Sequence, residues 1–126
     1  MSAPAGAARP KGAAHLSAET LASLRALLVD ELSTQVALVD ESRAIVAELT
    51  GQTDSDSVLE REMAEAAVER SGALIPEVEA AIARIDNGTY GNCEACGAPI
   101  PAERLEAIPH ARRCVACPES RGGLLG

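Results

Sequence analysis

The stretch that decides the fold runs from Gly88 to Cys117 and reads GTYGNCEACGAPIPAERLEAIPHARRCVAC. It contains all four cysteines of the chain as two Cys-x-x-Cys pairs, Cys93/Cys96 and Cys114/Cys117, with seventeen residues between the pairs. Two pairs at this spacing are typical of a four-thiolate zinc site, because each tight turn directs two sulfurs at one point and two turns complete a tetrahedron. Four protein ligands leave no position for water, so we expect one structural zinc ion.

Other interpretations of the cysteines fit less well. A disulfide framework requires an oxidising compartment, and the N-terminus lacks the apolar segment of a secretory signal. A thioredoxin-type redox pair requires a βαβ context, for which the chain has no room. His110 lies nearby in the sequence, but four thiols already suffice. We expect Gly97 to allow the first turn, and Arg112 and Arg113 to moderate the negative charge of the site.

Composition and charge restrict the class of protein. The 126 residues include no Phe, no Trp and one Tyr, which favours a helical hairpin with a thin aliphatic seam over a large globular core. Between Ser17 and Asn87 there are fifteen Asp and Glu against five Arg, and the whole chain carries a net charge of −8. Binding to nucleic acid through phosphates requires a basic face, so direct nucleic-acid binding is disfavoured. No apolar run is long enough to span a membrane, and we expect a cytoplasmic protein.

Two long helices precede the cysteines. Ser17 is a good N-cap, with Leu16 and Leu21 placed as a hydrophobic staple, and the first helix is predicted to run from Ser17 to Leu49. Its apolar stripe comprises Leu21, Leu24, Leu28, Leu32, Val36, Val39, Val46 and Leu49, interrupted by Ser42.

The second helix is predicted to start at a capping box, Ser57 to Glu60, and to end at Asn87 and Gly88. We expect Pro76 to kink this helix without breaking it. Its predicted apolar stripe comprises Leu59, Met63, Ala67, Leu74, Val78, Ile82 and Ile85.

The predicted fold is therefore mainly α: a long antiparallel helical hairpin, or coiled coil, followed by a small four-cysteine zinc module. The predicted segments are a disordered tail over residues 1–16, the hairpin over 17–88 with its tip loop near 50–57, the zinc module over 89–118, and a frayed end over 119–126. Inside the zinc module, one short helix is expected between Pro99 and Pro109, with Leu105 and Ile108 facing the small core. Tyr90 is expected to pack where the long helix meets this module.

The zinc segment resembles that of the DksA/TraR family of bacterial RNA polymerase-binding regulators. The residues that carry the resemblance stand in the family's order and spacing: Asn87 to Gly91, Cys93 to Gly97, Pro99 with Ile100, Arg104 to Ala107, and Cys114 to Cys117. The hairpin extends the likeness, in architecture, to about residues 17–118. The resemblance implies that the four cysteines bind zinc and that the hairpin enters the secondary channel of RNA polymerase, where an acidic tip approaches the active centre and modulates initiation.

Two departures from the family's pattern limit what the resemblance implies. Its best-known members have two tip aspartates three residues apart, whereas the candidates here, Asp54 and Asp56, are two apart and could be loop and capping residues. Members that respond to the alarmone ppGpp use basic residues at positions that align with Glu77, Ile108 and Pro118 here. We therefore expect no ppGpp binding of that kind.

The leading hypothesis is a non-enzymatic transcription regulator that binds RNA polymerase, without sequence-specific nucleic-acid contacts. A zinc-stapled helical adaptor for another protein is the alternative. A DNA-binding zinc finger ranks third because positive charge is missing. An enzyme ranks last, since the sequence shows no phosphate-binding glycine loop, no paired nucleophile and base, and no open metal site.

Overall fold

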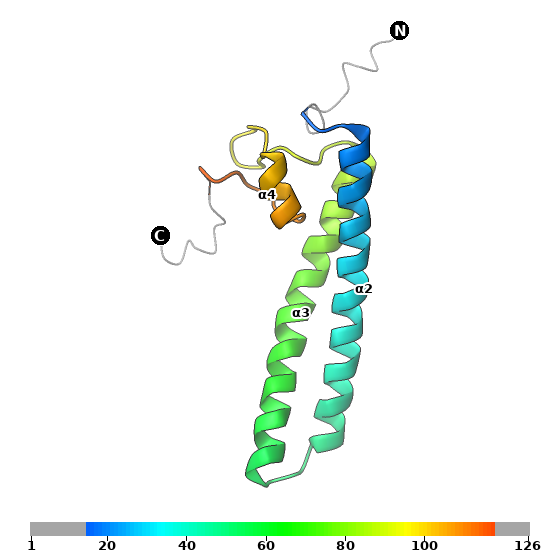
Figure 1. Cartoon of the computed structure of the whole chain (residues 1–126). Coiled ribbons are helices and arrows are strands. Elements are labelled where there is room, and N and C mark those ends of the chain that lie inside the picture. Colours follow the sequence, from blue (N-terminus) through cyan, green and yellow to red (C-terminus); the bar gives the residue numbers. More distant parts are fainter. Residues whose placement is uncertain (1–14, 118–126) are drawn as a thin grey trace. The chain divides into compact units, whose positions relative to one another are not determined.

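The computed structural model describes residues 15–117. Three helices lie in this range: α2 (Ala18–Leu49), α3 (Ser55–Asn87) and the short α4 (Ala102–Ala107) (Figure 1). The described residues contain no strand, only an isolated antiparallel bridge between Asn92 and Pro99. The prediction of a mainly helical chain with a helical hairpin ahead of the cysteines is confirmed. Of the tails predicted over residues 1–16 and 119–126, residues 1–14 and 119–126 lie outside the described residues, as does Pro118.

The described chain divides into two compact units. One is the central unit, Val29–Glu79, in which α2 and α3 run antiparallel and are joined by the tip loop. The other, the base unit, combines the described residues up to Leu28 with those from Ala80 onward. The domain boundaries proposed from the sequence remain a prediction.

The start of α2 follows from its capping residue. The backbone N–H of Thr20 donates a hydrogen bond to Ser17 Oγ at 3.0 Å, which satisfies one of the free N–H groups at a helix N-terminus. Leu16, just before the cap, is 7% exposed. His15 Nε2 lies 2.7 Å from the carbonyl oxygen of Ile100. The N-cap predicted at Ser17 is confirmed, and the two residues before it contact the folded chain.

The tip loop corrects one prediction. Gly51 adopts φ +93°, and the backbone N–H of Gln52 donates to Leu49 O at 3.0 Å, which ends α2. α3 then begins at Ser55, because Asp54 Oδ2 accepts the backbone N–H of Ser57 at 3.0 Å and caps the helix. The capping box predicted to start at Ser57 is wrong. An aspartate earlier in the chain caps the helix and adds a negative charge at its positive end.

The seam of the central unit differs from the predicted stripe on α3. The buried residues of this unit are Val39, Ser42, Ala64, Ser71 and Val78, and those on α3 recur at steps of seven. A strict seven-residue repeat is the period of a coiled-coil seam. All five of its members have small side chains or are β-branched, which suits close helix packing.

Leu59 and Met63, predicted to belong to this seam, are instead 57% and 64% exposed. Val36 on α2 is also exposed, at 41%. The prediction assigned large apolar residues at helical spacing to the seam. The seam instead buries the small residues Ala64 and Ser71, so the prediction failed at these positions. α3 itself continues through Pro76 without a break, as expected.

The C-terminus of α3 leads the chain into the cysteine segment. Gly88 adopts φ +82°, and the N–H groups of Thr89 and Gly88 donate to Arg84 O at 2.9 Å and Ile85 O at 3.3 Å. This pair of bonds is a Schellman motif, and glycine is favoured at its left-handed position. The predicted end of the helix is confirmed.

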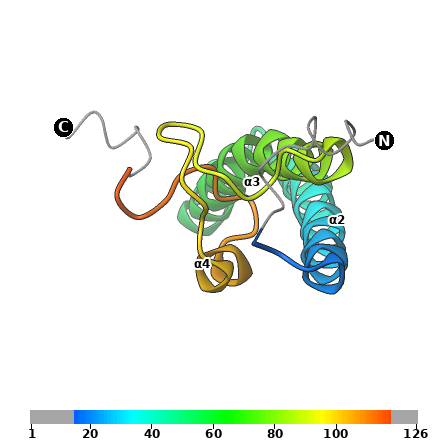
Figure 2. The same ribbon diagram turned by 90° about the horizontal axis from the view of Figure 1, so that it is seen from above.

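The base unit has its own small core. Its fully buried side chains are Leu24, Leu28, Ala81, Tyr90, Ile100 and Leu105. Arg25 on α2 forms a two-bond ion pair with Asp86 on α3, at 2.8 and 3.0 Å. Figure 2 shows the loop after α3, in yellow, leading into α4. Within the described part of the chain, no helix is long and apolar enough to cross a membrane.

Candidate metal centre

The first Cys-x-x-Cys pair lies on a tight turn. The backbone N–H of Gly97 donates to Cys93 O at 2.8 Å, and that of Cys93 donates to Ala98 O at 2.8 Å. Gly97 adopts φ +80°, a conformation that residues with a side chain rarely adopt. Asn92 Nδ2 donates to Gly97 O at 2.9 Å and ties the turn from outside. The expectation for Gly97 is confirmed in its backbone conformation.

The second pair forms a similar turn. The backbone N–H of Cys117 donates to Cys114 O at 3.0 Å. The two turns are held together by the N–H of Glu94, which donates to Arg112 O at 2.8 Å. This hydrogen bond joins residues that are eighteen positions apart in the sequence, and it lies next to both cysteine pairs.

The four sulfurs converge on one point. All four Sγ atoms lie within 4.8 Å of one another, and Cys96 Sγ lies 3.7 Å from Cys114 Sγ. A tetrahedral zinc ion with Zn–S bonds of about 2.3 Å separates its sulfurs by about 3.8 Å. The residues present therefore fit a zinc ion. Among residues 15–117 the cluster consists of cysteines alone, so His110 is not part of it.

The thiols of the cluster differ in acidity. Burial alone raises the pKa of Cys93, but hydrogen bonds from the backbone of Cys114, Cys96 and Ala95 outweigh it and lower this pKa to about 6. The pKa of Cys117 is raised to about 12, first by its hydrogen bonds with the Cys96 and Cys93 side chains. Zinc binds thiolates, so filling the site displaces protons.

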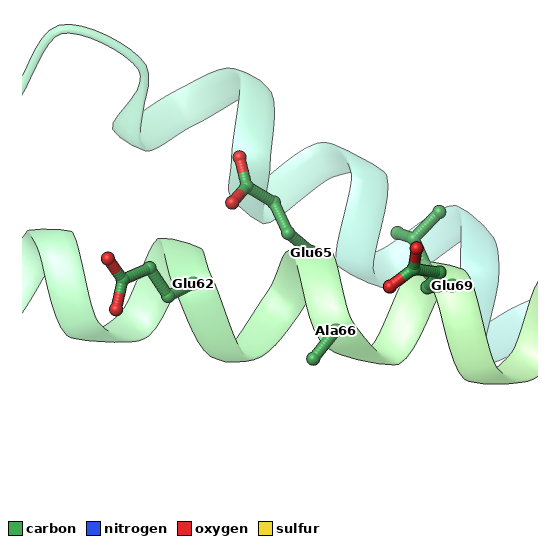
Figure 3. Close-up of a pocket in the computed structure, with 5 residues that line it drawn as sticks. Glu62, Glu65, Ala66 and Glu69 are labelled. Carbon is green, nitrogen blue, oxygen red and sulfur yellow. The ribbon is translucent and has the colours of Figure 1, made fainter.

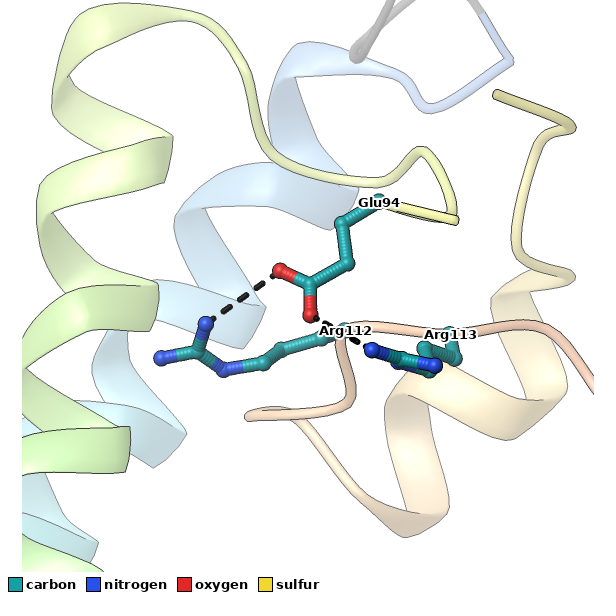
Figure 4. A network of polar contacts seen from close by, with 3 residues as sticks. All are labelled: Glu94, Arg112 and Arg113. Atoms are coloured by element: carbon teal, nitrogen blue, oxygen red, sulfur yellow. Dashed lines mark hydrogen bonds and ion pairs between the residues drawn. The ribbon is translucent and has the colours of Figure 1, made fainter. Parts of the chain in front are cut away.

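An ion-pair cluster braces the two turns. Glu94, inside the first pair, accepts hydrogen bonds from Arg112 at 3.2 Å and from Arg113 at 3.4 Å (Figure 4). Arg113 O in turn accepts from Arg104 Nε on α4 at 3.0 Å. The two arginines were expected to moderate the charge of the sulfurs, and the structure shows that they share their charge with Glu94. This role of Glu94 was not predicted from the sequence, although a glutamate in one turn and two arginines before the other are a visible signal.

A compact core supports the turns from one side. Leu105 on α4 and Ile100 are both 0% exposed, and Tyr90 is 1% exposed. The Tyr90 hydroxyl donates to Pro109 O at 2.7 Å. Burial raises the pKa of Tyr90 to about 12, against a smaller lowering effect of Arg84. Tyr90 and Leu105 thus lie in the core as expected.

The expectation that Ile108 faces this core together with Leu105 is wrong. It is 37% exposed and follows the last turn of α4, where its N–H donates to Arg104 O at 2.8 Å. Because Ile108 has left the helical path ahead of Pro109, its side chain no longer shares a face with Leu105. Ile100, before the helix, is buried instead.

The two predicted tip residues lie in the central unit, on the loop and first turn of α3. Asp54 and Asp56 are both exposed. Asp54 is the N-cap of α3, and its pKa is lowered mainly by the hydrogen bond from the backbone N–H of Ser57. Asp56 lies in the first turn, where a negative charge favours the helix. Both therefore have a structural role, whatever else they do.

Comparison with known proteins agrees with this geometry. Residues 88–121 match the family described as the prokaryotic dksA/traR C4-type zinc finger. The RNA polymerase-binding transcription factor DksA of Caulobacter vibrioides is 32% identical over 90 residues, which cover 65% of this chain and 63% of that protein. The zinc-finger segment is thus similar to that of the DksA/TraR family, and the similarity to Caulobacter DksA extends beyond this segment. The C4 zinc finger of this chain and its four clustered cysteines correspond to one structural zinc ion.

Other relatives match more locally. General stress protein 16O of Bacillus subtilis is 52% identical over 42 residues, which cover 33% of this chain and 26% of that protein. This chain thus spans between about a quarter and somewhat under two thirds of the length of these curated relatives. The structure of transcription factor DksA2 from Pseudomonas aeruginosa has a TM-score of 0.71 at 24% identity, covering 86% of this chain and 87% of that one. This last likeness concerns the fold.

Proposed function

We propose that this chain is a non-enzymatic regulator that binds RNA polymerase and modulates transcription initiation. The observation that carries the proposal is the match to Caulobacter DksA over 90 residues, because it extends well beyond the zinc finger. That relative is named as an RNA polymerase-binding transcription factor. The fold that this chain shares with DksA2 from Pseudomonas aeruginosa, at a TM-score of 0.71, supports the proposal.

In this proposal the zinc module is a structural brace. Cys93, Cys96, Cys114 and Cys117 hold the ion, and all four coordination positions are then filled by protein. The ion supplies a cross-link between two turns that lie far apart in the sequence. The chain's own residues do the rest: Glu94 pairs with Arg112 and Arg113 across the turns, and Tyr90 anchors the segment around Pro109.

The central unit supplies the part that enters the polymerase. Between Val29 and Glu79 there are thirteen Asp and Glu against three Arg, so this unit is strongly acidic. We propose that it enters the secondary channel with the tip loop first. Asp54 and Asp56 then approach the active centre, where carboxylates can interact with the Mg²⁺ region or with basic residues of the channel. Such acidity opposes direct binding to nucleic acid, and the site of action is the bacterial cytoplasm.

Site-specific crosslinking tests this mode of binding. Gln52 lies in the tip loop and is exposed, and it makes no side-chain capping contact that the structure records. A photoreactive amino acid at position 52 is expected to crosslink to the polymerase subunits around the active centre. The same group at Glu103, an exposed position on α4, is the control and should not reach that region. Binding without any crosslink from position 52 to the active-centre region contradicts channel entry, and no binding at all contradicts the proposed function and favours an adaptor for another protein.

A further inference from the structure

An apolar stripe on α3 faces away from the seam of the central unit. Leu59 and Met63 are 57% and 64% exposed, and Ala66 is also exposed. Steps of four and three place these three residues on one side of the helix. The buried positions Ala64 and Ser71 lie on another side, so the stripe has no partner within the described chain. Two large apolar side chains this exposed, one turn apart, are more than scattered surface residues.

Acidic side chains border the stripe. Figure 3 shows Glu62, Glu65 and Glu69 along α3, with Ala66 on the opposite side of the helix from Glu65. Together with Ala66 and Val68 they line a hollow of about 500 Å³. An arginine or lysine fits such a surface well, because its hydrocarbon stem can cover the alanine and valine while its cationic head meets the carboxylates.

The charge of the central unit selects among possible partners. With thirteen acidic residues against three arginines, it repels nucleic acid, an anionic membrane surface and a second copy of itself. Arg70, next along the stripe, is one of the few opposing charges. A basic protein surface is the occupant that satisfies both the apolar stripe and its acidic border.

We propose that the stripe of Leu59, Met63 and Ala66 is a docking surface for an arginine- or lysine-bearing protein surface, and that this surface belongs to RNA polymerase. The inference rests on the proposed function and adds to it a second contact, distinct from the aspartates at the tip. Leu59 and Met63 supply apolar contact area, and the neighbouring glutamates orient the cationic side chains of the partner. In this arrangement the shaft of α3 sets the affinity for the polymerase.

Binding of labelled full-length chain to core RNA polymerase tests the docking surface. The double variant Leu59→Gln/Met63→Gln keeps good helix formers and removes the apolar contact. We expect its dissociation constant to rise about ten- to hundred-fold, from the loss of two side chains that binding would bury. The matched control is Val36→Gln/Leu38→Gln, which removes two exposed apolar side chains from α2 in the same unit and should bind within about three-fold of the parent.

A charge variant tests the border. Glu62→Gln/Glu69→Gln should weaken binding and flatten its dependence on salt, since screening acts on the charges removed. Glu103→Gln/Glu106→Gln on α4 removes the same charge from exposed positions and should leave the salt dependence unchanged.

The possible outcomes distinguish a failure of the proposed function from a failure of the docking surface alone. If the parent does not bind core polymerase, the proposed function and this inference both fall. If the parent binds and Leu59→Gln/Met63→Gln binds equally well, or no worse than the Val36/Leu38 control, the docking surface is wrong while the function stands. Sedimentation showing a dimer of the parent that the Leu59/Met63 variant abolishes would assign the stripe to a second copy and also overturn the inference.

Discussion

Removing one hydroxyl tests how the cysteine segment is held together. The Tyr90 hydroxyl donates to Pro109 O at 2.7 Å, from a side chain that is 1% exposed. Tyr90→Phe keeps the buried ring and deletes the bond, which leaves a half-buried carbonyl without this donor. A lost hydrogen bond of this kind costs about 1–2 kcal/mol. We expect metal binding to supply folding free energy to the zinc module, so the cost should appear in the affinity for zinc.

The expected change is a five- to thirty-fold rise in the zinc dissociation constant, because 1–2 kcal/mol corresponds to about that factor. Competition with a fluorescent zinc chelator at fixed pH measures it. Thr34→Val is the control, since it deletes an exposed hydroxyl in the central unit and should change the constant less than two-fold. A Tyr90→Phe constant within two-fold of the parent would refute the reasoning that this bond holds the module.

The other predictions concern the metal, the pH and the alarmone. Cys114→Ser should lose the single zinc per chain and unfold the segment around 89–118 while much of the helical content remains by circular dichroism; full zinc retention would contradict the ligand assignment. Zinc affinity should increase with pH, because binding displaces protons, most clearly from Cys117, whose pKa is about 12; competition titrations at several pH values check this, and a flat profile argues against thiolate ligands. The pKa of Tyr90 is raised to about 12, so the stabilisation that neutral Tyr90 gives the folded module is complete below the ordinary pKa near 10 and is lost as the pH rises through 12. Phenolate absorbance should therefore appear near pH 12 in the parent and near pH 10 in Cys114→Ser. ppGpp should not bind the polymerase complex through the region of Glu77, which carries the wrong charge for it; micromolar binding that substitutions around Glu77 abolish would contradict this.

The zinc cluster could be predicted from the sequence because its geometry is local. Each Cys-x-x-Cys turn is determined by a few adjacent residues, and Gly97 supplies the conformation that the first turn needs. The helix boundaries at Ser17 and Gly88 were predictable for the same reason, since a cap and a Schellman motif are short-range features.

The features that the sequence did not reveal depend on two segments meeting. The seam of α3 follows Ala64, Ser71 and Val78, and small side chains of this kind identify a seam only when a second helix packs against them. Large apolar residues at helical spacing pointed instead to Leu59 and Met63. The ion-pair cluster of Glu94 with Arg112 and Arg113 likewise forms only when the two cysteine turns are adjacent.

Separating affinity from activity at the tip tests the central claim most directly. Asp54→Asn/Asp56→Asn removes both charges and keeps the ability to cap α3, because asparagine is as good a cap as aspartate. Its control, Asp30→Asn/Asp40→Asn, removes two exposed charges from α2 in the same unit. Binding to core polymerase and transcription from a sensitive promoter are measured for both variants. We predict that the tip variant binds with near-parental affinity and loses most of its effect on initiation, whereas the control keeps its effect. A tip variant that regulates like the parent would show that these aspartates only cap and close the loop, and would contradict the proposal that the tip acts at the active centre.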